Sequence, residues 1–279
     1  MKFNKIAIIG VGLIGGSIGL AVKKKRLAKE IVGVCRHRKS LRQAKRIKAI
    51  DRGALSCKEA IKEADLVILA TPISQIIKIA REIAPYLKKG CLVTDTGSTK
   101  SEIVGEIEKV FSEDIAFVGA HPLAGSEKRG VSEARANLFK DTLCILTQTR
   151  KTKLAAFKKI NTFWQVIGCH VIKLTPQRHD QIVAVISHLP HLAAAQLVKV
   201  GRKNLNFAAS GFRDTTRIAS SDAEVWSDIC LTNKEFIIQA IDQYITRLKL
   251  MQKLIYQEDK QRLSVEFRTA KTLRDGLQK

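Results

Sequence analysis

The segment Ala120–Val131, AHPLAGSEKRGV, carries a residue well suited to proton chemistry. It follows the apolar run Ile115–Val118, and neither a helical nor a strand-like period explains its order of residues. A neutral imidazole titrates near neutral pH and can accept a proton from a hydroxyl group. Because His121 follows an apolar run so closely, it is a candidate general base at the end of a strand.

Two other apolar runs end in residues that suit a ligand site. The run Leu66–Ala70 is followed by Thr71-Pro72, which could form a wall beside a nicotinamide ring, and another run leads into DTGSTK, Asp95–Lys100. In an open α/β sheet, ligands bind beyond the carboxyl ends of the strands. We therefore expect these segments to meet at one site. Together with the dinucleotide-binding motif Gly10–Gly15, they predict hydride transfer with His121 as the base.

A glycine motif near the N-terminus predicts a dinucleotide-binding turn. Gly10-Val-Gly12-Leu-Ile-Gly15 follows a strand-like run and opens a predicted helix, whose N-terminus can face a pyrophosphate. The alternatives are a glycine-rich turn without ligand and a signal peptide, but five glycines interrupt the uncharged run Ile6–Val22. The predicted cofactor contacts are Gly10, Gly12, Leu13, Ile14, Gly15, Arg36, Arg38, Thr71, Pro72, Asp95 and Gly97.

The second predicted strand indicates which dinucleotide binds. It ends in Cys35-Arg36-His37-Arg38, where an NAD site usually has an acidic residue for the ribose 2′-hydroxyl. Guanidinium groups suit a 2′-phosphate instead. The sequence therefore favours NADP over NAD, with surface arginines and NAD binding as the alternative.

Strand-like runs alternate with amphipathic segments up to about residue 172. This alternation predicts an α/β, Rossmann-type domain with a mostly parallel sheet covered on both faces. We expect residues 1–172 to form the dinucleotide-binding domain and residues 173–279 a helical domain for substrate binding and dimerisation. The predicted strands are Ile6–Ile9, Ile31–Cys35, Leu66–Ala70, Leu92–Thr94, Ile115–Val118, Leu143–Leu146 and Val171–Leu174.

The last hundred residues have helical periodicity. Asp180–Val200 is apolar almost all round, as in a buried helix, despite Pro190. From Lys234 to Tyr256, apolar residues recur at helical spacing over about six turns. Because these helices offer more apolar surface than a small domain can cover, we expect a homodimer through this region.

Two polar clusters lie within the predicted helices. Asp180, Ser187, His188 and His191 are spaced so that they can share one face, but no third ligand accompanies the histidines, so we predict no metal site. The second cluster lies in Ser210–Trp226, SGFRDTTRIASSDAEVW. It is either a capped loop with an internal ion pair or a site that holds an arginine for a substrate carboxylate.

Composition limits the classes of function. The chain has 279 residues and a formal net charge of +23, yet its basic residues are scattered and no nucleic-acid recognition motif accompanies them. We interpret them as a solvated basic surface that suits small anionic ligands, and we expect no specific nucleic-acid or membrane partner. The six cysteines form no Cys-x-x-Cys pair, which is typical of a reduced, cytoplasmic protein.

Five segments together resemble the prephenate/arogenate dehydrogenases of tyrosine biosynthesis. The resemblance covers nearly the whole chain and implies an NAD(P)-dependent oxidative decarboxylation that releases carbon dioxide from a cyclohexadienol. It also implies a homodimer built from the helical domains. The segments are Gly10–Ser17, Asp95–Lys100, His121–Gly130, Ser187–His191 and Gly211–Asp228.

The resemblance further implies roles for individual residues. His121 is the base on the ring hydroxyl, and Ser98 orients that hydroxyl. Arg217 holds a substrate carboxylate and is positioned by Asp214 and Trp226. Further pocket residues implied by the resemblance are Lys100, Ser126, Glu127, His188 and His191.

The choice of substrate stays open between prephenate, which would give 4-hydroxyphenylpyruvate, and arogenate, which would give tyrosine. Ser126 offers no carboxylate for the ammonium of arogenate, which favours prephenate, although the adjacent Glu127 could supply that charge. Two other classes compete: a β-hydroxyacid dehydrogenase, which would need a catalytic lysine in the helical part, and a redox-sensing nucleic-acid-binding regulator.

Overall fold

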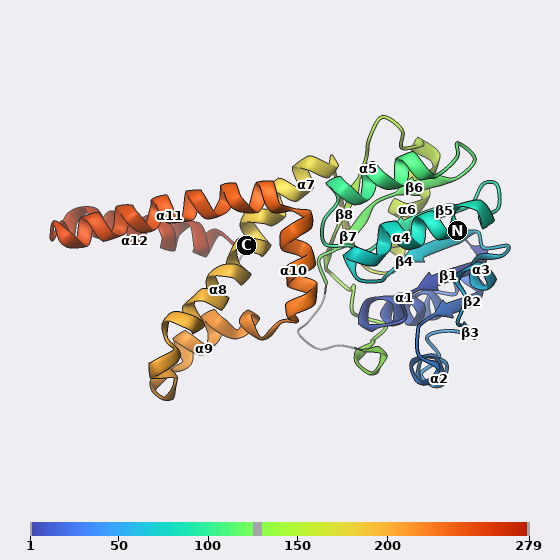
Figure 1. Ribbon diagram of the computed structural model, residues 1–279, viewed down its shortest axis with the longest axis horizontal. Coiled ribbons are helices and arrows are strands. Elements are labelled where there is room, and N and C mark those ends of the chain that lie inside the picture. The colour runs from blue at the N-terminus through green and yellow to red at the C-terminus, as the bar shows by residue number, and fades with distance from the viewer. Residues whose placement is uncertain (1, 125–129, 278–279) are drawn as a thin grey trace. The chain divides into compact units, whose positions relative to one another are not determined.

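The computed structural model describes residues 2–124 and 130–277. Its backbone contacts divide the chain into two compact units, Met1–Asn233 and Lys234–Lys279. The first unit contains both sheets and the helices up to α10, and the second is a pair of helices (Figure 1).

A six-stranded parallel sheet forms the centre of the first unit, with strand order β3-β2-β1-β4-β5-β6. The strand β4 and the second halves of β1 and β2 are almost entirely apolar and buried, and β5 is also buried, because both faces of the sheet are covered. The strands are β1 Phe3–Ile9, β2 Ala28–Val34, β3 Arg52–Ala54, β4 Leu66–Leu69, β5 Leu92–Asp95 and β6 Ala116–Val118. The short β3 was not predicted from the sequence.

The side chains of β1 alternate between two separate hydrophobic cores. Ile6 and Ile8 belong to a core that includes residues of α1 and α6, whereas Ala7 and Ile9 belong to one that includes α3, α4 and α5. This alternation confirms the predicted sheet with helices on both faces. These helices and the short α2 between them are α1 Leu13–Lys24, α2 Arg38–Arg46, α3 Cys57–Ile61, α4 Ile73–Ile83, α5 Ser101–Val110 and α6 Leu154–Val166.

A second, three-stranded sheet carries His121. β7 Ala120–Pro122 pairs antiparallel with β8 Leu143–Thr147, which pairs in parallel with β9 His170–Leu174. The prediction that 143–146 and 171–174 extend the large sheet is therefore wrong, as is the reading of 120–122 as non-strand. The two sheets join at Gly119, where a Cβ atom would lie 2.5 Å from Thr147 Oγ1, so only glycine allows this approach.

A long helix, 176–200, follows β9. It consists of α7 Pro176–Val183, a π-helical turn at Ala184–His188 (η3) and α8 Leu189–Val200. Pro190 cannot donate a backbone hydrogen bond, and the π turn lies just before it, which explains how a proline fits here. The expected burial is wrong for a single chain, because Val185, Ile186, Leu197 and Val200 are exposed. By length and composition alone this helix could cross a membrane, a test that the core helices of soluble proteins also pass.

The rest of the first unit is helical. The segment Ser210–Trp226 is not a loop: it forms α9 Ser210–Thr216, a 3₁₀ turn at Arg217–Ser220 (η5) and the start of α10 Ala223–Thr232. Asp222 caps α10 by accepting a hydrogen bond from Val225 N at 2.9 Å.

The second unit is a pair of helices, α11 Lys234–Tyr256 and α12 Lys260–Gly276. The bounds of α11 match the predicted helix, and α12 folds back along it (Figure 1). An ion pair between Arg247 and Glu266 joins the two helices, and Asp259 caps α12. Many of their large apolar side chains are exposed in a single chain, among them Ile238, Ile245, Leu248, Phe267 and Leu273.

Candidate active site

The glycine motif forms a turn that only glycines can make. Gly10 has φ +98°, and a Cβ atom there would lie 2.3 Å from the carbonyl oxygen of Ala70. At Gly15 a Cβ atom would lie 2.1 Å from Gly10 O, so the helix can pack this closely only without a side chain. At Gly12, by contrast, a Cβ atom would meet nothing within 4 Å. The open space therefore lies at the N-terminus of α1, where a pyrophosphate can reach the backbone.

A groove of about 380 Å³ runs from this turn along the carboxyl ends of β1, β2 and β4. Gly10, Gly12, Arg36, Thr71 and Pro72 line it, as predicted, and no acidic residue lies in the first turn of α1. Thr71 Oγ1 is buried beside it without a hydrogen-bond partner among the described residues. The empty space at Gly12 and this orphaned hydroxyl fit a bound nicotinamide dinucleotide.

The other predicted cofactor residues lie around the groove. Leu13 and Ile14 begin α1, and Arg38 begins α2, beside the lining residue Arg36. The sequence analysis missed several lining residues, because nothing in their types indicates a ligand: Cys35, Ser40, Leu55, Cys57, Gln75, Ile79, Gly130 and Val131.

A second cavity, of about 390 Å³, brings the candidate chemical residues together. Ser98 comes from the end of β5 and His121 from β7. His188 and His191 come from the π turn and α8, and Trp226 from α10. The predicted cluster of Ser98, His121, His188 and His191 is thus found in one place, with Trp226 beside it. The apolar remainder of the lining was not predicted: Pro122, Leu123, Ala124, Val183, Ile186 and Ile229.

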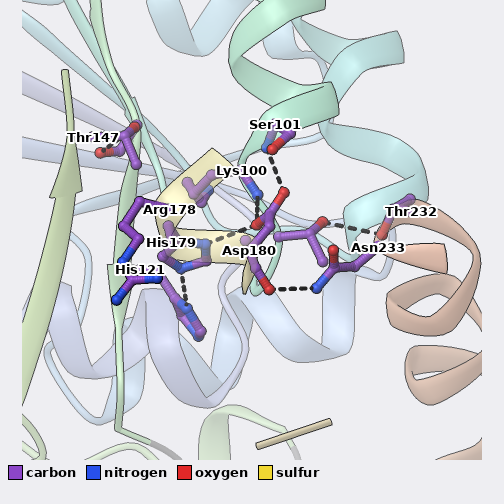
Figure 2. A network of polar contacts seen from close by, with 12 residues as sticks. Lys100, Ser101, His121, Thr147, Arg178, His179, Asp180, Thr232 and Asn233 are labelled. Atoms are coloured by element: carbon purple, nitrogen blue, oxygen red, sulfur yellow. Dashed lines mark hydrogen bonds and ion pairs between the residues drawn. The ribbon is translucent and has the colours of Figure 1, made fainter. Parts of the chain in front are cut away.

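Behind the cavity, His121 begins a chain of buried polar contacts (Figure 2). His121 Nδ1 lies 2.8 Å from His179 Nε2, and His179 Nδ1 lies 2.8 Å from Asp180 Oδ1. His179 and Asp180 are almost completely buried. Burial, followed by electrostatic repulsion from His179, Lys100 and His188 whenever those groups carry a proton, holds the pKa of His121 well below its usual value. His121 is therefore neutral at neutral pH.

The partners of Asp180 determine which nitrogen of each imidazole carries a proton. Its carboxylate accepts from Lys100 N and Ser101 N, both at 2.8 Å, and as an acceptor it requires a proton on His179 Nδ1. Burial raises the pKa of Asp180, but hydrogen bonds from His179 and Ser101 outweigh it and keep the pKa low. Neutral His179 then accepts at Nε2 from His121 Nδ1, which leaves His121 Nε2 unprotonated, as a general base requires.

Lys100 and Asp95 are buried beneath the cavity and have a structural role. Their side chains are fully buried and form an ion pair with each other, and Asp95 also accepts from Gly97 N at 2.8 Å and Ala120 N at 3.1 Å. Neither residue lines the groove or the cavity. The direct ligand contacts of Lys100, Asp95 and Gly97 therefore stay predictions, and the contacts just given assign Lys100 and Asp95 a structural role. Asp95 ties the start of β7 to the end of β5.

His188 presents a hydrogen-bond donor. Asn233 Nδ2 donates to the carbonyl oxygen of Asp180 at 2.9 Å, which fixes the orientation of its amide, and it also lies 3.1 Å from His188 Nδ1. His188 Nδ1 must accept, so its proton is on Nε2. That nitrogen is buried and unpartnered among the described residues. Burial lowers the pKa of His188 to about 4, so the ring stays neutral.

Trp226 and Arg217 lie near His191. The indole stacks on the His191 ring, with centroids 3.6 Å apart, and His191 Nδ1 lies 3.0 Å from Ser187 O. Arg217 is exposed but close enough for its charge to add to burial in lowering the pKa of His191. Asp214 is exposed on α9 and does not line the cavity.

Other predicted features can be placed only in part. Ser126 and Glu127 fall outside the described residues. Within the described ranges, no group of three or more histidine, cysteine, aspartate or glutamate side chains could hold a metal ion. His179 was missed, although a histidine next to Asp180 was a usable signal.

The groove and the cavity lie at the ends of the neighbouring strands β4 and β5, and together they define a nicotinamide-dependent dehydrogenase. Comparison with known proteins gives the family. The sequence model of the prephenate dehydrogenase nucleotide-binding domain matches residues 18–173, and that of the dimerization domain matches residues 175–269. The chain belongs to the prephenate dehydrogenase family.

Individual relatives agree with this assignment. A prephenate dehydrogenase of Bacillus subtilis is 39% identical over 98% of this chain and 76% of its own. The crystal structure of the Aquifex aeolicus prephenate dehydrogenase with hydroxyphenyl propionate and NAD+ has a TM-score of 0.94 at 31% identity, covering 99% of both chains. The Synechocystis arogenate dehydrogenase has a TM-score of 0.85 at 27% identity, over 98% of this chain and 99% of its own.

Proposed function

We propose that this enzyme converts prephenate to 4-hydroxyphenylpyruvate and carbon dioxide. The observation that carries the proposal is that His121 and Ser98 line the same cavity. The contact of His121 Nδ1 with His179 leaves His121 Nε2 without a proton. The bound nicotinamide supplies the hydride acceptor. His121 accepts the ring hydroxyl proton while Ser98 orients that hydroxyl. A general base of this kind contributes about 10²- to 10⁴-fold to the rate.

The substrate's charged groups require partners of their own. We assign one carboxylate to Arg217, which is close enough to the cavity residue His191 for its charge to affect that imidazole. Ser126 and Glu127 remain proposed pocket residues, and Asp214 a proposed partner that positions Arg217. The basic surface of the chain favours a dianionic substrate.

His188 favours prephenate over arogenate. The two substrates differ in the side chain, where prephenate has a keto oxygen and arogenate an ammonium group. A neutral imidazole with its proton on Nε2 can donate to a keto oxygen but offers an ammonium neither charge nor acceptor. The similarity to an arogenate dehydrogenase structure keeps arogenate as the second candidate.

Arg36 and Arg38 support NADP as the preferred cofactor. Arg36 lines the groove just after β2, and among the described residues the groove lining contains no carboxylate for a ribose 2′-hydroxyl. A guanidinium group can pair a 2′-phosphate. NAD remains the alternative, since the Aquifex structure contains it.

We also propose that the enzyme is a cytoplasmic homodimer that assembles through its helical domain. The exposed apolar side chains of the helix 176–200 and of α11 and α12 support this assembly. The functional boundary is proposed near residue 172, supported by the adjoining ends of the two family matches at 173 and 175.

A four-way assay tests the proposed function. Purified enzyme is mixed with prephenate or arogenate, each with NAD or NADP, and formation of reduced nicotinamide is followed. We expect the highest kcat/KM with prephenate and NADP. A clear preference for arogenate would contradict the role given to His188, and no reduction in any mixture would contradict the proposed function itself.

A further inference from the structure

The contact between His121 and His179 goes beyond what a single base needs. Two imidazoles lie in series, with ring centroids 5.0 Å apart, and the chain ends on the Asp180 carboxylate (Figure 2). A histidine that only needed orientation could use a backbone carbonyl instead. A second imidazole is different because it can itself accept a proton.

The proposed reaction needs a proton to be removed and then returned. Prephenate dianion and oxidised cofactor give 4-hydroxyphenylpyruvate monoanion, carbon dioxide and reduced cofactor, which balances with no proton gained or lost. The hydroxyl proton must leave as hydride departs. After loss of carbon dioxide, the phenolate oxygen must recover a proton. The enzyme therefore needs a group that holds one proton temporarily. It does not need a path that carries this proton to solvent.

The charges around the two imidazoles favour His179, the one farther from the cavity, as the group that holds the proton. Burial and the positive charge of Lys100 both disfavour a second proton on His121. The pKa of His179 is also lowered by its burial, but the hydrogen bond with Asp180 offsets part of this lowering. Lys100 and Asp95, the other charged groups near His179, have opposite signs and are paired with each other.

The far end of the chain is closed. Asp180 accepts hydrogen bonds on both carboxylate oxygens, from the backbone N–H groups of Lys100 and Ser101. Its side chain is 1% exposed, and that of His179 is 0% exposed. A proton that reaches His179 therefore has no further carrier in this chain of contacts and can only return through His121.

We propose that His179 is a positioning residue that also stores the transferred proton, next to Asp180, between the two halves of the reaction. This inference rests on the proposed function. In the first half, the substrate O–H bond breaks and an N–H bond forms at His121 Nε2. At the same time the Nδ1–H bond of His121 breaks and one forms at His179 Nε2. The C–H electron pair leaves as hydride to the nicotinamide, giving a dienone.

In the second half, the bond between the ring and its carboxylate breaks, and carbon dioxide leaves. The electron pair of that bond enters the ring and produces a phenolate oxygen. The two proton transfers then run in reverse, so that His179 and His121 regain their starting tautomers. Atoms and charges balance, and no other oxidant or proton source takes part.

The tautomers can be read without turnover. Nitrogen-15 NMR of the imidazole groups in the whole, labelled protein should show His121 protonated at Nδ1 and bare at Nε2, and His179 also protonated at Nδ1. In His179→Phe the preference of His121 for the Nδ1 proton should be lost. His121 protonated at Nε2 in the unsubstituted protein would overturn the proposal, whatever the enzyme's substrate.

His179→Gln separates proton storage from orientation. Its amide oxygen can still accept from His121 Nδ1, but it cannot take a proton. We expect kcat to fall about 10²-fold, within the range for general acid–base steps, with KM nearly unchanged. The exposed His170, changed to Gln, is the matched control and should behave as the unsubstituted enzyme.

The pH profile distinguishes storage from a purely structural role. Activity falls in acid once the histidine pair binds a proton before substrate arrives. Without His179 the pair loses its better proton site, the one beside Asp180, so the acid limb of kcat/KM should move to lower pH. A fall in kcat with an unmoved acid limb would overturn storage, and an unchanged kcat would overturn any role for His179.

Discussion

The cofactor groove and the substrate cavity lie at neighbouring strand ends, but they are built in opposite ways. Around its glycine turn the groove is mostly backbone, and Gly10, Gly12 and Gly15 shape it by lacking side chains. The cavity consists of side chains from distant segments, and its chemistry depends on His179, Asp180 and Asn233 behind it. The groove therefore recognises a shape, whereas the cavity depends on fixed protonation states.

The largest expected effect is a loss of stability beneath the cavity. In Lys100→Met the fully buried Asp95 loses its ion-pair partner, and an uncompensated buried charge costs about 3–5 kcal/mol. Unfolding in urea, followed by circular dichroism, should show this loss. The control is Lys271→Met in the exposed pair with Asp275, which should change little. Equal stability of the two variants would show that the cavity does not depend on the buried pair.

The next effect concerns the groove. In Gly15→Ala, the new Cβ atom would lie 2.1 Å from Gly10 O, and relieving this clash should cost about 1–3 kcal/mol and weaken cofactor binding. Titration calorimetry with NADP measures it. Gly105→Ala is the matched control, because its Cβ atom meets nothing within 4 Å on the exposed face of α5. Undiminished cofactor affinity in Gly15→Ala would contradict a backbone-shaped groove.

A third variant tests whether the two regions act separately. Arg217→Ala should raise KM for prephenate about 10- to 100-fold, because a charge-assisted hydrogen bond to a carboxylate is lost. Cofactor affinity should stay unchanged. Arg213→Ala, four residues earlier on α9, is the control. A loss of cofactor affinity in Arg217→Ala would show that the assignment of this arginine to the substrate cavity is wrong.

The smallest expected effect is a change in cofactor affinity that leaves substrate binding unaltered. Arg36→Ala should weaken NADP binding about three- to tenfold, because Arg36 is exposed and its pairing with a phosphate is screened by solvent. NAD binding and KM for prephenate should not change, and Arg42→Ala on α2 should be silent. If the affinities for NAD and NADP fall equally, Arg36 does not bind the 2′-phosphate.

The two regions also differ in what the sequence could predict. The glycine turn was predicted because strand, glycines and helix are contiguous, and their spacing alone specifies the geometry. His121 was identified by its type and place, but its strand was missed because β7 has only three residues and pairs with a strand far ahead in the sequence, where His121 lies opposite Ile145. Short strands of this kind have no periodicity to detect.

Roles that depend on burial were the hardest to predict. The family resemblance implied a pocket role for Lys100, and because lysines are rarely buried, only the three-dimensional structure shows its buried ion pair with Asp95. His179 was overlooked because its importance comes from contact with His121, which the sequence does not show. Asp180–Val200 was predicted as a buried helix with more apolar surface than one domain can cover, and one chain indeed leaves part of that surface exposed.

The most direct test of the central claim is turnover of His121→Asn compared with the unsubstituted enzyme, using prephenate and NADP, with cofactor affinity measured on the same samples. Asparagine removes the base but leaves the groove intact, so kcat should fall about 10²- to 10⁴-fold while the Kd for NADP stays the same. Unchanged turnover would remove His121 from the mechanism and contradict the account of the cavity.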